Sequence, residues 1–248
     1  MKIVITGASS GLGEEIAYRY ASSDNHLVLM ARNSDRLEQV ANRCRDLGAM
    51  VDVVIVDVSD FAHLQSVAKE IDGVDMAILN AGVSLGHESD GVTPFGDFKS
   101  VIDINFLSLH ALLEPLLPQM MERKSGTIVF ISSLASLFTM PTSIAYSSSK
   151  RAINAYAEGL SYQLARYNID VINIAPGFID SQMTRKNRFN MPFLLSTSDG
   201  VDRILQAIED KKRFYTFPFR FALIIKIISL FPYRLREKIV NYLNFKKG

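Results

Sequence analysis

Short apolar runs alternate along the chain with longer segments in which hydrophobic residues recur at helical spacing. Runs of this kind, rich in Val, Ile and Leu, predict strands buried on both faces. These strands span Lys2–Thr6, Leu27–Ala31, Val51–Val56, Asp75–Leu79, Thr127–Ile131, Ile169–Ile174 and Arg213–Phe217. The predicted helices span Gly11–Ser22, Ser34–Leu47, Phe61–Ile71, Ser100–Arg123, Ala145–Tyr167 and Asp199–Lys211. Strict alternation predicts the α/β class, with a single doubly wound parallel sheet covered by helices on both faces.

Composition narrows the class of protein further. The chain has 248 residues, 48% of them hydrophobic, which is typical of a packed globular protein. Its one cysteine, Cys44, allows no internal disulfide, and its four His form no cluster with ligand spacing. The net charge of +1 argues against a dedicated nucleic-acid binder. We therefore expect neither a metal nor a nucleic-acid partner.

The charges are divided unevenly along the chain. Residues 211–248 hold ten Lys and Arg against one acidic residue, whereas residues 1–210 hold 17 against 25. The composition changes near Pro218, so we expect one catalytic domain over residues 1–217 and an apolar, basic extension over residues 218–248. The N-terminal residues lack the apolar stretch of a signal peptide, which predicts a cytoplasmic protein.

The first predicted strand runs directly into a glycine-rich turn and then a helix. The turn reads Thr6-Gly7-Ala8-Ser9-Ser10-Gly11-Leu12-Gly13. Glycines permit a tight turn and a close backbone approach, and a helix N-terminus offers free N–H groups to phosphate oxygens. A structural turn is the alternative, but the position after the first strand favours a Rossmann-type dinucleotide site.

Further motifs follow in order along the chain. They are Asp57-Val58 after the third strand, Asn80-Ala81-Gly82 after the fourth, Asn105, then Ser133 with Tyr146 and Lys150, and Pro176-Gly177 after the sixth. Together with the Gly-x-x-x-Gly-x-Gly spacing of the turn, these motifs resemble the classical short-chain dehydrogenase/reductase family over residues 1–181. The resemblance implies an oxidoreductase that uses a nicotinamide cofactor.

The resemblance also assigns residues to roles. The cofactor-binding residues that it implies are Gly7, Ser9, Ser10, Gly11, Leu12, Gly13, Arg32, Asp57, Val58, Asn80, Ala81, Gly82, Tyr146, Lys150, Pro176, Gly177, Ile179 and Ser181. The catalytic residues that it implies are Asn105, Ser133, Tyr146 and Lys150. In the family, Asp57-Val58 would contact the adenine, Pro176-Gly177 would lie beside the nicotinamide, and Asn105 would hold a water that links Lys150 to solvent. Ser181 stands where the family most often has threonine.

The chemistry of three side chains supports this assignment independently. Tyr146 and Lys150 are one helical turn apart and share a face. We expect the ammonium to favour the phenolate and to bring the tyrosine pKa down toward neutrality, so that Tyr146 can exchange a proton with a substrate oxygen. Ser133, at the end of the fifth strand, can hydrogen-bond that oxygen and orient it. Each residue alone could be structural, but together with the turn they favour catalysis.

The end of the second strand indicates which cofactor is used. A fold that prefers NAD usually places an acidic residue there, against the ribose 2′-hydroxyl. Ala31 occupies that position and Arg32 follows, whose guanidinium suits a 2′-phosphate. An exposed arginine at a helix start is the alternative. The sequence therefore predicts NADPH/NADP⁺ rather than NADH, and with it carbonyl reduction.

A segment after the sixth strand is predicted to cover the substrate. Residues 184–196 include the apolar side chains of Phe189, Met191, Phe193, Leu194 and Leu195. We expect a mobile lid here, and its apolar content predicts a hydrophobic or lipid-like substrate. Simple packing of the lid on the core is the alternative interpretation.

The C-terminal extension departs from the family pattern. Residues 214–231 are strongly apolar but are interrupted by Pro218, Arg220 and Lys226, which argues against a transmembrane helix. The following segment, Tyr233–Phe245, is amphipathic and basic. Two interpretations stay open: peripheral contact with the inner face of an anionic membrane, or a helix pair packed on the core or on a second subunit. Because about thirty residues follow the last predicted strand, Arg213–Phe217, the final-strand contact of the family's tetramers is not expected, and a homodimer is predicted.

The predicted function is the NADPH-dependent reduction of a small hydrophobic ketone or aldehyde, or the reverse oxidation of the alcohol, with Tyr146 as general acid and base. An NADP(H)-binding regulatory or scaffold protein without turnover is the alternative from another class. A nucleotide-sugar epimerase shares the Tyr-x-x-x-Lys pair, but its Gly-x-x-Gly-x-x-Gly turn does not match residues 7–13.

Overall fold

The computed structural model describes residues 1–85, 92–186 and 191–245. Seven parallel strands form one sheet in the order β3-β2-β1-β4-β5-β6-β7. The strands are β1 (Lys2–Thr6), β2 (His26–Ala31), β3 (Met50–Ile55), β4 (Met76–Leu79), β5 (Gly126–Ile131), β6 (Ile169–Pro176) and β7 (Phe214–Phe217). The predicted α/β class and doubly wound parallel sheet are confirmed.

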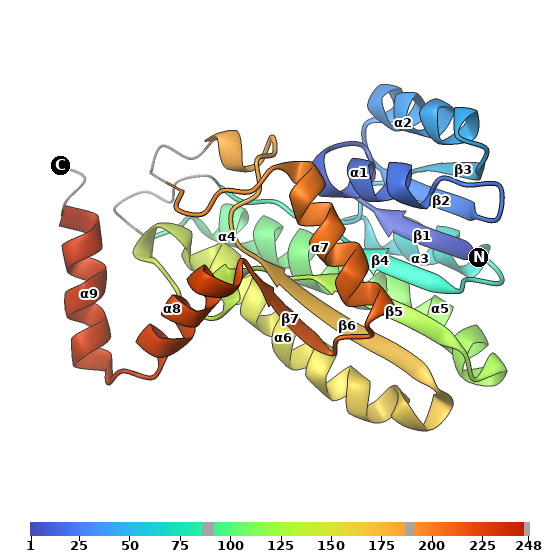
Figure 1. The fold of residues 1–248 in the computed structure, drawn as a ribbon. Helices are drawn as coiled ribbons and strands as arrows, with labels where there is room; N and C mark the ends of the chain where they lie inside the picture. The colour runs from blue at the N-terminus through green and yellow to red at the C-terminus, as the bar shows by residue number, and fades with distance from the viewer. Residues whose placement is uncertain (86–91, 187–190, 246–248) are drawn as a thin grey trace.

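Helices cover both faces of this sheet (Figure 1). The helices are α1 (Gly11–Tyr20), α2 (Ser34–Asp46), α3 (Phe61–Lys69), α4 (Phe95–Ile102), α5 (Ser108–Arg123), α6 (Ile144–Leu164), α7 (Thr197–Glu209), α8 (Phe219–Ser229) and α9 (Tyr233–Phe245). One core cluster joins α1, α2 and α7 to the first face, and a second joins α3, α5 and α6 to the other. The sheet is therefore the middle layer of three.

The strand order reverses direction beside β1. The chain moves outward from β1 to β2 and β3, then returns to place β4 on the other side of β1. Ligands of doubly wound sheets bind outside the carboxyl ends of the strands at this point, because the two adjoining connections lead to opposite faces and leave a crevice. The glycine-rich turn after β1 and the Asn80 turn after β4 flank this crevice.

One predicted helix differs from the observed one. Instead of beginning at Ser100, the helical run begins at Phe95 and contains a π-helical turn over Asp103–Leu107 before it continues as α5. π-Turns inside α-helices often occur at functional sites, and this one carries Asn105. The run Phe95–Arg123 is the one helix of the described residues that is long and apolar enough to cross a membrane, but it packs over the sheet as a core helix.

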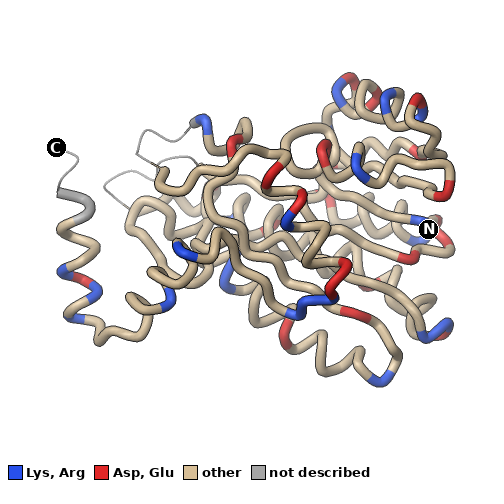
Figure 2. Tube along the Cα trace, viewed as in Figure 1, with Lys and Arg blue, Asp and Glu red and all other residues tan. Residues whose placement is uncertain are grey.

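The C-terminal extension lies apart from the sheet. Figure 1 shows α8 beside β7 and α9 projecting from the body of the molecule. Acidic and basic positions alternate over the body, whereas the tail carries basic positions and a single acidic one, Glu237 (Figure 2). The division into a domain over residues 1–217 and an extension stays a prediction, since α8 follows β7 after one residue and packs against it.

Candidate cofactor and active site

The glycine-rich turn has a backbone that only glycine adopts without strain. Gly7 and Gly11 have positive φ angles of 67° and 60°. A Cβ atom at Gly13 would lie 2.3 Å from the carbonyl oxygen of Gly7, so α1 can pack this closely only with glycine there. Ser10 caps α1 without a side-chain hydrogen bond to the helix. The first N–H groups of α1 therefore have no side-chain cap and face the crevice.

Thr6 and Asn80 hold the two sides of the crevice together. The Thr6 hydroxyl oxygen accepts hydrogen bonds from the backbone N–H groups of Asn80 and Ala81, each at 3.0 Å. The Asn80 amide donates to the Thr6 carbonyl oxygen at 3.1 Å. These bonds join the ends of β1 and β4. The side-chain amide at position 80 makes one of them, which is a structural reason for asparagine there.

A pocket of about 280 Å³ runs along this edge of the sheet. The predicted site residues that line it are Gly7, Ser9, Ser10, Gly11, Leu12, Arg32, Asp57, Val58, Asn80, Ala81, Gly82, Ser133, Tyr146, Lys150, Pro176, Gly177, Ile179 and Ser181. Lining residues outside the predicted catalytic and cofactor-binding sets are Ala31, Val56, Val83, Ile104, Ile131, Ser132, Gln182, Met183 and Thr184. Most of these directly adjoin a predicted residue, so proximity to the motifs could have found them.

Two predicted residues do not line the pocket. Gly13 lies behind the turn, where it allows the contact with Gly7. Asn105 is fully buried in the π-helical turn, and its amide accepts from Val83 N at 2.7 Å and donates to Val83 O at 2.9 Å and to Ser149 Oγ at 3.0 Å. It therefore fixes the segment at Val83 that follows the Asn80 turn. The water that the family resemblance assigns to Asn105 stays a prediction.

Ser133 and Tyr146 meet at the inner end of the pocket. Ser133 lies two residues after β5 and caps the 3₁₀ turn Leu134–Ser136, where its hydroxyl oxygen accepts the N–H of Ala135 at 3.1 Å. The hydroxyl hydrogen of Ser133 is thereby left for the Tyr146 oxygen, and this bond acts to lower the pKa of Tyr146. Burial of the phenol has the larger effect and raises that pKa above its ordinary value of 10.0.

The expectation that the pKa of Tyr146 falls toward neutrality is therefore wrong for this geometry, because burial outweighs the effects that favour the phenolate. The Lys150 ammonium donates to the Ile131 carbonyl oxygen at 2.8 Å, and its nitrogen lies 5.7 Å from the centre of the Tyr146 ring. Burial lowers the pKa of Lys150 itself from 10.5 to about 8. Desolvation thus dominates both groups, which leaves Tyr146 as a neutral phenol and Lys150 charged at neutral pH.

Arg32 and Asp57 lie at the outer end of the pocket. Two hydrogen bonds from Ser59 lower the pKa of Asp57, and the positive charge of Arg32 adds to this effect. The Arg32 guanidinium lies 3.9 Å from the Asp57 carboxylate, too far for a hydrogen bond, and its side chain is 70% exposed. Ala31 is buried beside it, so no carboxylate stands at the position that favours NAD.

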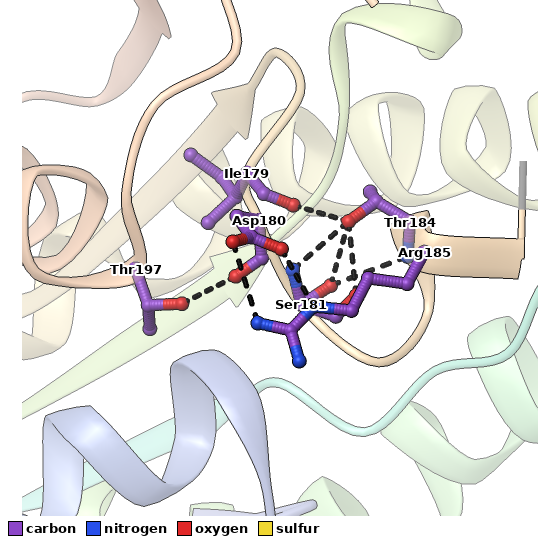
Figure 3. A network of polar contacts seen from close by, with 6 residues as sticks. All are labelled: Ile179, Asp180, Ser181, Thr184, Arg185 and Thr197. Carbon is purple, nitrogen blue, oxygen red and sulfur yellow. Dashed lines mark hydrogen bonds and ion pairs between the residues drawn. The ribbon is translucent and has the colours of Figure 1, made fainter. Parts of the chain in front are cut away.

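A polar network fixes the loop after β6 (Figure 3). The Thr184 hydroxyl donates to the Ile179 carbonyl oxygen at 2.5 Å and accepts from the Ser181 N–H at 2.9 Å. Asp180 binds the Arg185 guanidinium at 2.8 Å, and the Thr197 hydroxyl donates to the Asp180 carbonyl oxygen at 2.5 Å. The hydroxyl at Ser181 thus lies in a closed turn whose inner surface faces the pocket.

The predicted lid is anchored at its second end. Leu195 donates its N–H to the Phe178 carbonyl oxygen at 3.0 Å and accepts from the Asp180 N–H at 2.9 Å. Phe189 lies outside the described residues, and the mobility of the lid stays a prediction. The anchored end carries Phe193, which stacks on Phe221 of α8.

The C-terminal extension forms a wall beside this lid. Phe221 of α8 stacks on both Phe178 and Phe193, with ring centres 5.7 Å apart in each pair. Ala222 and Ile225 of α8 pack on Leu134, the residue that follows Ser133. Four segments that are distant in the sequence therefore pack together beside Ser133 and Gly177, which line the pocket.

Comparisons with known proteins all point to one family. Residues 1–191 match the family model of the short chain dehydrogenases. The chain is 31% identical to an uncharacterised oxidoreductase of Myxococcus xanthus over 92% of each chain. It is 34% identical to human dehydrogenase/reductase SDR family member 7 over 75% of this chain, which spans 58% of the human protein.

Among solved structures, a short-chain dehydrogenase from Sphingobium yanoikuyae in complex with NADPH is similar in fold. The two share 25% sequence identity and superpose with a TM-score of 0.81 over 88% of each chain. The family match and the fold thus agree over the part of the chain that forms the pocket.

Proposed function

This chain belongs to the short-chain dehydrogenase family of oxidoreductases, and from that membership we propose that it is an NADPH-dependent reductase of a hydrophobic ketone or aldehyde. The observation that carries the proposal is the placement of Ser133, Tyr146 and Lys150 in one pocket with the glycine-rich turn. A nicotinamide dinucleotide bound in this pocket supplies the hydride.

The residues of the turn fit a dinucleotide. The glycines leave room that a Cβ would fill, and the start of α1 presents uncapped N–H groups to the same space. These groups would hold the pyrophosphate, with Asp57 and Val58 beside the adenine and Pro176 and Gly177 beside the nicotinamide. Because the pocket connects all of these positions, one extended molecule can contact them together.

Proton donation follows from the burial of Tyr146. A raised pKa keeps the phenol protonated at neutral pH, which suits a group that gives its proton to the oxygen of a carbonyl under reduction. The Ser133 hydroxyl orients that oxygen, and the nearby positive charge of Lys150 stabilises the phenolate left behind. Lys150 is held for this purpose by its bond to the Ile131 carbonyl oxygen.

Arg32 supports a preference for NADPH. Among the described residues, the one ionic contact of its guanidinium is the long pair with Asp57, so the group can turn toward a 2′-phosphate. The related Sphingobium structure is in complex with NADPH, which agrees with this assignment. The hydrophobic substrate is inferred from the aromatic wall of Phe178, Phe193 and Phe221.

A panel of ketones and aldehydes of increasing apolar size tests the proposal. Purified protein should consume NADPH, measured by its absorbance, and should favour the larger apolar members. The matched control is Tyr146→Phe, which should bind NADPH nearly as well and lose most turnover, because general acid catalysis contributes roughly a hundredfold to ten-thousandfold. If NADPH binds but no carbonyl is reduced, the protein is a cofactor-binding regulator and the reductase assignment fails.

A further inference from the structure

The helix α8 has two distinct apolar faces. Its inner face holds Phe221, Ala222 and Ile225, which pack on the body of the molecule beside the active site. Its outer face carries a second apolar row, whose members are four or three residues apart and so share one side of the helix. The row consists of Phe219 (72% exposed), Leu223 (45%), Ile227 (48%) and Leu230 (84%).

Basic side chains flank this outer row. On a helical projection Lys226 lies next to Phe219, and Arg220 lies between Ile227 and Ile224. Both basic side chains are exposed, and α8 contains no acidic residue. The next helix, α9, continues the pattern with exposed Leu235 and Tyr242 and with several basic residues against the single Glu237.

From this arrangement we propose that the outer face of α8, continued by α9, docks reversibly on an anionic lipid membrane. An apolar row between cations allows the apolar side chains to enter the boundary of the acyl chains while Arg220 and Lys226 reach anionic headgroups. Docking needs both attractions, since neither a few exposed apolar side chains nor a few cations bind a membrane stably by themselves.

The charge pattern favours a lipid surface over a second copy of the chain. Two tails facing each other across a twofold axis would bring like charges together around the apolar row. An anionic bilayer provides the opposite charge over its whole surface. Membrane docking would also place the wall formed by Phe178, Phe193 and Phe221 next to the bilayer, where apolar carbonyl compounds dissolve.

Sedimentation with vesicles tests the proposal and does not depend on reductase activity. Full-length protein should pellet with vesicles of phosphatidylcholine and phosphatidylserine at low salt and remain in solution with phosphatidylcholine alone. The double variant L223S/I227S should lose this binding. The double variant R220Q/K226Q should bind roughly tenfold to thirtyfold more weakly, because each cation near an anionic surface contributes ~1 kcal/mol.

Matched controls separate docking from unfolding. L47S/M50S removes two comparably exposed apolar side chains from another region, and K69Q/R203Q removes two exposed cations from the body. Both should bind vesicles like the wild type, and all variants should keep the wild-type thermal transition. Wild-type protein that stays in the supernatant with anionic vesicles at low salt, or L223S/I227S protein that pellets normally, overturns the proposal. If the wild type binds no vesicles but self-associates, and L223S/I227S abolishes that self-association, the outer face of α8 binds a second copy of the chain instead.

Discussion

The two ends of the pocket are built by different means. At the cofactor end, backbone atoms determine the shape: Gly7, Gly11 and Gly13 set the turn, and Thr6 joins it to Asn80. At the substrate end, side-chain packing contributes more, because α8 meets Leu134 and the lid through apolar and aromatic contacts. The lid is also tied to the loop after β6 by the backbone hydrogen bonds of Leu195. The first end depends on short sequence spacing and the second on contacts between distant segments.

This difference predicts different responses to substitution. A change in the glycine-rich turn of the cofactor end meets a rigid backbone and should affect every dinucleotide that binds there. A change at the substrate end meets side chains that can repack, so its effect should be smaller and should depend on the size of the substrate. The buried pair Tyr146 and Lys150 lies between the two ends.

The largest effect is expected for Lys150→Met. This substitution changes the buried lysine that lies between the cofactor end and the substrate end of the pocket. Turnover should be lost. The apo protein should nevertheless gain up to about 3 kcal/mol of stability at neutral pH, because the buried ammonium has a pKa of about 8 against 10.5 when unfolded.

The sign of this effect can be checked by pH. Below the folded pKa, the wild type carries the full penalty of burying a charge. As the pH rises from about 8 toward 10.5, the folded lysine loses its proton first, and the advantage of the variant should fade. Urea unfolding of both proteins over this range measures it, with Lys69→Met, at an exposed lysine, as the control. If the free energies of unfolding of Lys150→Met and the wild type differed by the same amount at all pH values, the lowered pKa of Lys150 would be contradicted.

Gly13→Ala should displace the whole glycine-rich turn at the cofactor end of the pocket. The new Cβ would lie 2.3 Å from the Gly7 carbonyl oxygen, so the turn must move, and we expect the free energy of unfolding to fall by about 1–3 kcal/mol. NADPH and NADH should both bind more weakly. Gly159→Ala is the matched control: it sits in α6 with open space around it and should stabilise by ~0.5–1 kcal/mol.

Arg32→Ala, a side-chain change at the cofactor end, should weaken the binding of NADPH but not of NADH. Loss of one charge-assisted contact, worth ~1.5–3 kcal/mol, should weaken NADPH binding roughly tenfold to a hundredfold and leave NADH nearly unchanged. The preference of the wild type should also decline as salt rises, because the side chain is exposed. Arg203→Ala serves as the control for net charge. Equal losses for the two cofactors would show that another group recognises the phosphate.

The smallest effect is expected for Phe221→Leu at the substrate end. The substitution removes two aromatic stacking contacts, each worth ~0.5–1.5 kcal/mol, while keeping an apolar side chain. KM for bulky carbonyl substrates should rise a few-fold, and the NADPH dissociation constant should not change. Phe219→Leu, at an exposed position on the same helix, is the control. A change in NADPH affinity would contradict the separation of the two ends.

Prediction from sequence succeeded where the determinants are local. All seven strands were predicted within one or two residues, since buried parallel strands are continuous apolar runs. The glycine-rich turn and the Asn80 turn could be recognised because backbone requirements dictate their residues. The pocket brings Ser133, Tyr146 and Lys150 together as their spacing indicated, although their catalytic roles stay predictions.

Prediction failed where the determinants are distant in sequence or depend on burial. The pKa of Tyr146 differs from the prediction because one-turn spacing to Lys150 does not reveal that the phenol is buried, and burial raises this pKa. The contact of Phe221 with Phe193 joins the tail to the lid, and no periodicity encodes such a pair. The π-helical turn around Asn105 was missed because its residues also suit an ordinary helix.

The position of α8 has a consequence for the order in which the chain becomes functional during synthesis. The ribosome releases the strands in the order of the sequence. The residues that line the pocket end at Thr184, but the core that packs α1 and α2 on the sheet also contains α7 and Phe217. The substrate end lacks its aromatic wall until Phe221 has emerged. Since domains fold as units, the sheet and its pocket can be completed only after α7 and β7 have left the ribosome. Phe221 follows Phe217 by four residues, so the aromatic wall is the last part of the site to be made.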